Sequence, residues 1–126
     1  MENEQLEIRK QVWKAISAFY LDTELQEGDY IYLIKVFKKS GLSLIELKAI
    51  DLYEVFPILQ YNLLGVAGVW DAFEEVWLFE KCLKNHHRRN TQIFRGAVTF
   101  MNAFCYWMRK DHWQKIEELW NTNHDL

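Results

Sequence analysis

Residues that form turns are scarce in this chain, which has 5 glycines and 1 proline among its 126 residues. All-β sandwiches and barrels need a turn every few residues, and glycine and proline are the residues that most often make those turns. Apolar residues instead recur at intervals of three and four, the spacing that places side chains on one face of a helix. The sequence therefore predicts an all-α fold.

Half of the residues are apolar, and a chain of this length buries roughly two-thirds of its surface on folding. We expect residues 1–126 to form a single domain, a compact bundle of six or seven helices. The expected helices cover about residues 4–21, 29–39, 43–55, 57–64, 71–88 and 91–109, with a last short helix from Asp111. In the helix over residues 71–88, the residues expected to face the core are Phe73, Val76, Trp77 and Leu83. The corresponding apolar faces are Leu6, Val12, Trp13, Ile16, Phe19 and Tyr20 in the first helix, Tyr30, Leu33, Ile34 and Phe37 in the second, and Trp113, Ile116 and Trp120 in the last.

Short local signals set the ends of these helices. Asp29 is expected to cap the second helix, and Gly41 to end it in the left-handed conformation. Ser43 and Glu46 have the spacing of a capping box at the start of the third helix. Pro57 disfavours helical geometry at the preceding residue, so the third helix is expected to end just before it and Pro57 to open the next.

The helix expected over residues 91–109 is apolar around most of its axis. Its polar side chains form one stripe with spacings of four, three, four and three: Arg95, Thr99, Asn102, Tyr106 and Arg109. A helix with so narrow a polar face is typical of a buried position. The sequence therefore predicts that this helix is the central one of the bundle.

Charge is unevenly distributed, although the formal net charge is only −3. Residues 42–80 carry seven acidic side chains and one basic one, whereas residues 81–110 carry seven basic side chains and no acidic one. The helix dipole accounts for part of this pattern, because acidic residues favour the first turn of a helix and basic residues the last. It does not account for the acidic cluster of Asp22, Glu24, Glu27 and Asp29, four carboxylates within eight residues.

These four carboxylates repel one another, and helix ends use only one or two of them as caps. An exposed acidic face attracts a basic partner; a solvated acidic loop without a partner is the alternative interpretation. Trp70 and Tyr30 are candidate aromatic anchors of such a face. The candidate partner-binding residues are Asp22, Glu24, Glu27, Asp29, Trp70, Asp71, Glu74 and Glu75.

Common catalytic and cofactor-binding motifs are absent from the sequence, among them the glycine-rich phosphate loop, HExxH, paired CxxC and GxSxG. We therefore expect no catalytic residue, no metal and no cofactor. Cys82 and His86 share a helix face, but no second pair accompanies them, so a buried cysteine is the favoured interpretation. An acid–base pair would require the fold to bring together two of four carboxylates: Asp22, Glu24, Glu54 and Asp71.

The first five residues are acidic and polar, unlike the basic start of a secretory signal. The longest uncharged run, residues 55–70, has sixteen residues, and the next, residues 96–108, has thirteen, whereas a bilayer-spanning helix needs about 20 residues. Two cysteines are too few for a disulfide scaffold. Together these features predict a cytoplasmic protein with reduced thiols.

Four segments carry a resemblance to a known family: residues 21–25 (LDTEL), 54–57 (EVFP), 62–64 (NLL) and 66–70 (VAGVW), the last with Phe73. In these the chain resembles a small bacterial family of uncharacterised helical domains, over about residues 6–83. Some members are encoded beside polymorphic toxins. The resemblance therefore implies an immunity protein of a contact-dependent growth inhibition or similar toxin system, and it carries over no catalytic residue.

The function expected from the sequence is that of an immunity protein, which binds and neutralises a secreted nuclease toxin. Nucleases carry basic surfaces for their phosphate substrate, so an acidic inhibitor complements them. On this interpretation the chain is a monomer and not an enzyme, its partner is a basic toxin domain, and it binds neither membrane nor nucleic acid. The alternative is a nucleic-acid-binding or nuclease-like module that uses the basic segment 84–95.

Overall fold

A computed structural model describes residues 2–20, 24–63 and 75–122. These residues form helices and no strand, which confirms the all-α class. The helices are α1 (Asn3–Ser17), α2 (Glu27–Lys39), α3 (Leu44–Ile50), α4 (Phe56–Leu63), α5 (Glu75–Arg88), α6 (Gln92–Cys105) and α7 (Trp107–Thr122). A 3₁₀ turn, η1 (Ala18–Tyr20), follows α1, and a π-helical turn, η2 (Asp51–Val55), joins α3 to α4.

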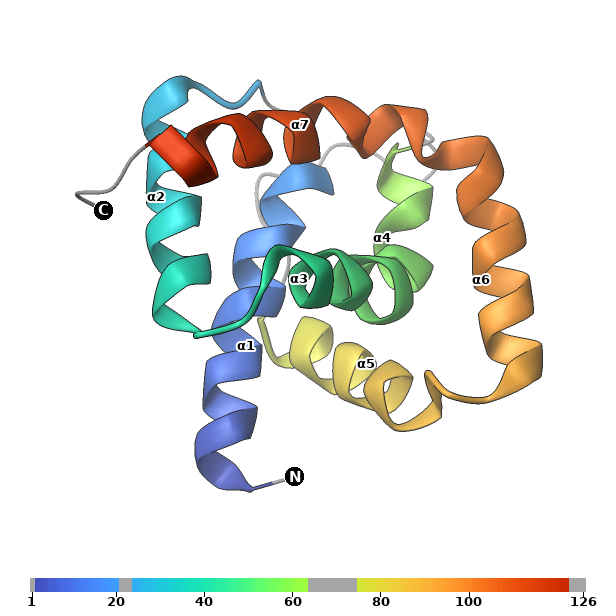
Figure 1. Cartoon of the computed structure of the whole chain (residues 1–126). Helices are drawn as coiled ribbons and strands as arrows, with labels where there is room; N and C mark the ends of the chain where they lie inside the picture. The colour runs from blue at the N-terminus through green and yellow to red at the C-terminus, as the bar shows by residue number, and fades with distance from the viewer. Residues whose placement is uncertain (1, 21–23, 64–74, 123–126) are drawn as a thin grey trace.

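The centre of the molecule is the continuous helical segment formed by α3, η2 and α4. In Figure 1, α3 lies in the middle, with α1, α5, α6 and α7 around it. The turn η2 packs against α1, α5 and α6 as well as against its own neighbours in the chain. The fully buried apolar side chains of the segment formed by α3, η2 and α4 include Leu47, Ile50, Val55 and Phe56.

The prediction that residues 91–109 form the central helix is wrong. The chain bends at Tyr106, so the expected helix is divided between α6 and α7. Of the α6 side chains that the structure describes, Val98 alone is fully buried, whereas Ile93 is 85% exposed. Part of the polar stripe faces inward instead: Arg109 is 1% exposed and donates to Asn102 Oδ1 at 2.9 Å. The prediction assumed that the polar stripe faces solvent. Arg109 of this stripe instead binds the buried carboxylate of Asp51 and lies in the core.

The third helix does not end before Pro57, contrary to the sequence-based expectation. Phe56 is helical, with φ −53° and ψ −44°, and its amide donates to the carbonyl of Asp51, five residues earlier. Proline has no amide hydrogen and interrupts the regular four-residue hydrogen-bond pattern of an α-helix. The π-helical turn changes that pattern directly before the proline, so the helix continues through it.

Two of the predicted helix-end signals are confirmed and two are corrected. Gly41 follows α2 with φ +78°, and Ser43 Oγ accepts from the Glu46 amide at 3.1 Å. The Glu46 carboxylate accepts from the Ser43 hydroxyl and not from its amide. Asp29 is not the N-cap of α2: Gln26 is, and the Asp29 carboxylate accepts from the Gln26 amide at 2.8 Å.

The predicted inward faces are largely correct in α1 and in α7, where Trp113 and Ile116 are buried, and partly wrong in α5. In α1 and η1 the buried apolar residues include Val12, Trp13, Ile16, Phe19 and Tyr20, as expected. In α5, Val76 is 69% exposed, and the buried positions are Leu78, Cys82 and Asn85. Asp111 lies inside α7 and does not cap it. The expected cap at Asp71 lies outside the described residues.

Within the ranges that the structure describes, we find no helix with the length and apolar character needed to cross a membrane.

Candidate functional site

A groove runs along the surface between α1 and α2, which lie side by side (Figure 1). One part encloses about 640 Å³ and the next about 320 Å³. The two parts are continuous because Gln11, Tyr32 and Val36 line both. Ile8 and Tyr32 present apolar surface in this groove, and Tyr32 is 65% exposed.

One end of the groove is acidic. Glu24 and Asp29 line it, and Glu27, the first residue of α2, is exposed beside them in the chain. Neither Glu24 nor Glu27 forms an ion pair with any residue in the described ranges. Their charges are therefore available to a binding partner.

Tyr30 lies among these carboxylates at the start of α2. Burial and the negative charges of Asp111, Asp29 and Glu24 raise the pKa of Tyr30 above its ordinary value. The hydroxyl of Tyr30 lies 2.8 Å from Nδ1 of His112, whose ring stacks on Phe19. Asp111 on α7 thus contributes negative charge near Tyr30, in addition to the carboxylates of the acidic cluster.

The groove walls also carry lysines, so the whole groove is not acidic. Lys35 and Lys39 line the larger part, and Lys14 lines the smaller part. Lys14 is paired with Glu75 at 2.7 Å across α1 and α5. The negative charge of Glu75 and its hydrogen bond raise the pKa of Lys14.

The structure brings several of the predicted partner-binding residues to this groove. Glu24 and Asp29 line it, Glu27 lies at its acidic end in the chain, and Glu75 reaches its edge through Lys14. The other predicted residues lie outside the described ranges: Asp22, Trp70, Asp71 and Glu74. Sequence analysis missed Tyr32, although its place off the inward stripe of α2 indicates an exposed aromatic side chain.

Two acidic residues of the segment 42–80 are buried, so they cannot contribute to an exposed acidic face. Asp51 and Glu54 are 1% and 0% exposed, and both lie on η2. Asp51 accepts hydrogen bonds from Tyr20 Oη, from Arg109 Nε at 3.0 Å and from Trp113 Nε1 at 2.9 Å. These two acids stabilise the interior rather than face solvent.

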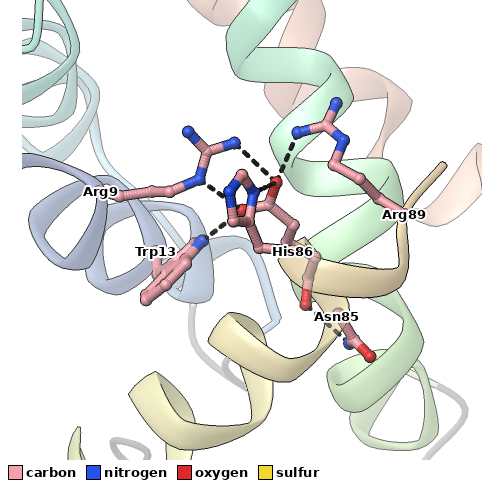
Figure 2. A network of polar contacts seen from close by, with 6 residues as sticks. Arg9, Trp13, Asn85, His86 and Arg89 are labelled. Carbon is pink, nitrogen blue, oxygen red and sulfur yellow. Dashed lines mark hydrogen bonds and ion pairs between the residues drawn. The ribbon is translucent and has the colours of Figure 1, made fainter. Parts of the chain in front are cut away.

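Glu54 is the centre of a second buried network (Figure 2). Arg9 binds its two carboxylate oxygens at 2.8 and 2.7 Å, and Trp13 Nε1 donates at 2.8 Å. Arg89 donates at 2.5 Å, and His86 Nδ1 lies 3.1 Å from the same carboxylate. Burial acts to raise the pKa of Glu54, but the hydrogen bonds from Arg9, Trp13 and His86 and the charge of Arg9 lower it overall. Glu54 is therefore a charged structural group, which does not fit an acid–base pair.

The suggested Cys82–His86 metal pair receives no support from the geometry. Cys82 is fully buried, as expected, and burial strongly raises the pKa of its thiol. His86 points to Glu54 (Figure 2). Burial lowers the pKa of His86, and the opposing effect of Glu54 does not outweigh it. In the described part of the chain, no group of three His, Cys, Asp or Glu side chains is arranged to hold a metal ion.

Comparison with known proteins places the chain in a family without assigning an activity. A family model matches residues 7–119, so the chain belongs to the family described as Domain of unknown function (DUF7079). The match includes the C-terminal helices, beyond the 6–83 region of the resemblance. Searches of the curated proteins and of the solved structures found no match.

Proposed function

We propose that this protein is an immunity protein, which neutralises a basic toxin domain by binding it in and around the groove between α1 and α2. The observation that supports this function is the combination of an apolar groove wall, including the 65% exposed Tyr32, with two carboxylates at one end, Glu24 and Glu27, that form no ion pair within the described ranges. Aromatic residues surrounded by a more polar rim are typical of the sites that dominate binding energy in protein interfaces.

The two features have separate roles in binding. Charges at the rim of an interface mainly accelerate association, because long-range attraction steers the partner. Buried anchors mainly slow dissociation. The carboxylates therefore determine the salt dependence of the association rate, and Tyr32 determines the lifetime of the complex.

The charge role is tested with Glu24→Lys combined with Glu27→Lys. Asp29 is left unchanged because it binds the Gln26 amide at the start of α2. The matched control, Glu2→Lys with Glu80→Lys, changes net charge equally at exposed positions away from the acidic end. We expect the first variant to associate about tenfold or more slowly at low salt and the control to keep most of the wild-type rate. Equal rates for the two variants would contradict the assignment.

The anchor role is tested with Tyr32→Ala, which removes an exposed ring and leaves the buried face of α2 intact. We expect faster dissociation, with a loss of about 2 kcal/mol or more in binding free energy. Ile45→Ala is the control, because Ile45 is 82% exposed on α3, outside the groove. Similar dissociation rates for both variants would exclude Tyr32 as an anchor.

The toxin for these measurements is the C-terminal domain of a secreted protein encoded beside this gene. Co-expression of this chain should restore growth of cells that produce that domain, and the purified pair should form a complex. A genome without such a neighbour, or a neighbour that kills cells despite co-expression, would contradict the proposed function.

The alternative function, nucleic-acid binding by the basic segment 84–95, is less well supported than the immunity function. Arg88 donates to Asn85 Oδ1 at 2.8 Å, and its guanidinium lies 4.7 Å from the centre of the Phe94 ring. Arg89 donates to Glu54. These two arginines therefore hold the fold together, and removing both would test stability as much as binding.

A further inference from the structure

Three basic side chains from separate parts of the chain meet at Glu54 (Figure 2). Arg9 comes from α1, His86 from the last turn of α5, and Arg89 from the turn after it. Their side chains are 18%, 25% and 19% exposed, respectively, whereas Glu54 is fully buried. The buried carboxylate of Glu54 thus binds all three basic side chains, and each of these side chains is partly exposed to solvent.

A fourth basic residue joins the cluster through Tyr53, the neighbour of Glu54 on η2. The guanidinium groups of Arg89 and Arg95 lie 5.4 and 4.4 Å from the centre of the Tyr53 ring. Arg95 Nη2 also donates to Tyr53 Oη at 3.0 Å. The ring therefore brings an exposed arginine of α6 close to the groups on Glu54.

The cluster has more positive than negative charge. Arg9, Arg89 and Arg95 contribute three positive charges, and Glu54 contributes one negative charge, which leaves a surplus of two. In the described ranges none of the three arginines pairs with another carboxylate. The charges that act on His86 are those of Glu54, Arg9 and Arg89.

Several donors of the cluster have no acceptor within the ranges that the structure describes. Arg9 uses Nε and Nη2 for Glu54, and Arg89 uses Nη1. Arg9 Nη1 and Arg89 Nη2 have no partner among the described residues. Because Glu54 and Tyr53 already fix the guanidinium groups, a ligand would bind without the usual cost of ordering two long side chains.

We propose that Arg9, His86, Arg89 and Arg95 form a binding site for a phosphate group. A phosphate has the oxygen geometry that guanidinium forks match, and a phosphomonoester has enough charge to neutralise the surplus of two. A carboxylate ligand has a single negative charge, so it would leave one of the two surplus positive charges without a counter-charge. The site is separate from the α1–α2 groove, so it stands whether or not the protein is a toxin inhibitor.

The phosphate could belong to a small phosphomonoester or to the backbone of a nucleic acid, and two probes distinguish these sources. Glycerol phosphate, a simple phosphomonoester, represents the first and a short single-stranded RNA the second. Binding is measured on the full chain by calorimetry and by NMR shifts at about 50 mM salt, where phosphate contacts are strong. We expect saturable binding, with shifts at Arg89 and Arg95.

Arg95→Gln is the main variant, because Arg95 is exposed and contacts Tyr53 rather than a buried acid. Lys35→Gln, an equal change of charge on α2, is the control. Loss of a charge-assisted contact should weaken binding about tenfold in Arg95→Gln and not in the control. Arg89→Lys keeps the charge near Glu54 but loses the fork, and it should also weaken binding.

Binding of glycerol phosphate that depends on Arg95 would support a phosphomonoester ligand. RNA binding alone, with the same dependence on Arg95, would support the phosphate site with a nucleic-acid backbone as its source. If neither probe binds at low salt, or if Arg95→Gln and Arg89→Lys bind as tightly as Lys35→Gln, the proposed site is overturned.

Discussion

Asp51 and Glu54 lie three residues apart on one π-helical turn, and each accepts a hydrogen bond from a tryptophan indole and an arginine guanidinium. For Asp51 the donors are Trp113 and Arg109 of α7, and for Glu54 they include Trp13 and Arg9 of α1. One central turn is thereby tied to helices from both ends of the chain. The charged groups provide this connection where apolar packing alone would not fix the orientation of the helices.

The Asp51–Arg109 pair should be essential for stability. Both side chains are 1% exposed, so removing the cation leaves a buried carboxylate without its counter-charge. Burial acts to lower the pKa of Arg109, but the charge of Asp51 raises it overall. For Arg109→Gln we expect a loss of about 3–5 kcal/mol in the free energy of unfolding, measured by urea denaturation.

Lys48→Gln is the control for this measurement. It breaks a cross-helix ion pair with Glu117, but both side chains are more than a third exposed. Exposed pairs contribute about 0–1 kcal/mol, so this variant should remain close to wild type. Comparable losses in Arg109→Gln and Lys48→Gln would show that burial does not give the Asp51 pair its importance.

Glu54 should make the free energy of unfolding depend on pH in the acidic range. Its pKa is lower in the folded chain than its ordinary 4.5, so its contribution is complete above that pH and is lost as pH falls through the folded pKa. Glu54→Gln has no such proton to bind. We expect it to be less stable than wild type by about 3 kcal/mol at neutral pH, and to lose less stability between about pH 5 and pH 3. Parallel stability curves for the two proteins would exclude this linkage.

Local signals in the sequence predicted the fold where neighbouring residues determine the structure. The apolar spacing of α1, the left-handed Gly41 and the Ser43 cap each depend on contacts within a few residues. The continuation of the helix through Pro57 did not follow from such a local rule. It depends on a π-helical turn whose residues are held by groups elsewhere in the chain.

The polar networks were not predictable from the sequence because their members are far apart. Arg9 and Glu54 are separated by 45 positions, and Trp113 and Asp51 by 62. The charge pattern of residues 42–80 was visible, but it did not distinguish Asp51 and Glu54, which are buried, from Glu75, which is exposed. Only the three-dimensional structure shows which acidic residues are buried in the core and which are exposed at the surface.

Gly41 should resist substitution more than Gly96. Gly41 has φ +78°, a conformation that other residues adopt at a cost of about 1–2 kcal/mol. Gly96 lies inside α6 with no atom within 4 Å of an added Cβ. In urea denaturation, Gly41→Ala should lose about 1 kcal/mol, whereas Gly96→Ala should gain about 0.5–1 kcal/mol from better helix propensity. Equal effects at the two glycines would contradict the left-handed turn after α2.

His112 should reduce stability as pH falls below neutral. Burial lowers its pKa below the ordinary 6.5, although Asp111 and Asp51 act in the opposite direction. Between the unfolded and folded pKa values the unfolded chain binds the proton and the folded chain does not, so lowering the pH favours unfolding. NMR titration of the ring should give a midpoint below 6.5. The free energy of unfolding should fall from about pH 7.5 to pH 5.5, and by less in His112→Gln. A midpoint at or above 6.5 in the folded protein would show that burial does not lower the pKa of His112, and would remove the basis for this dependence.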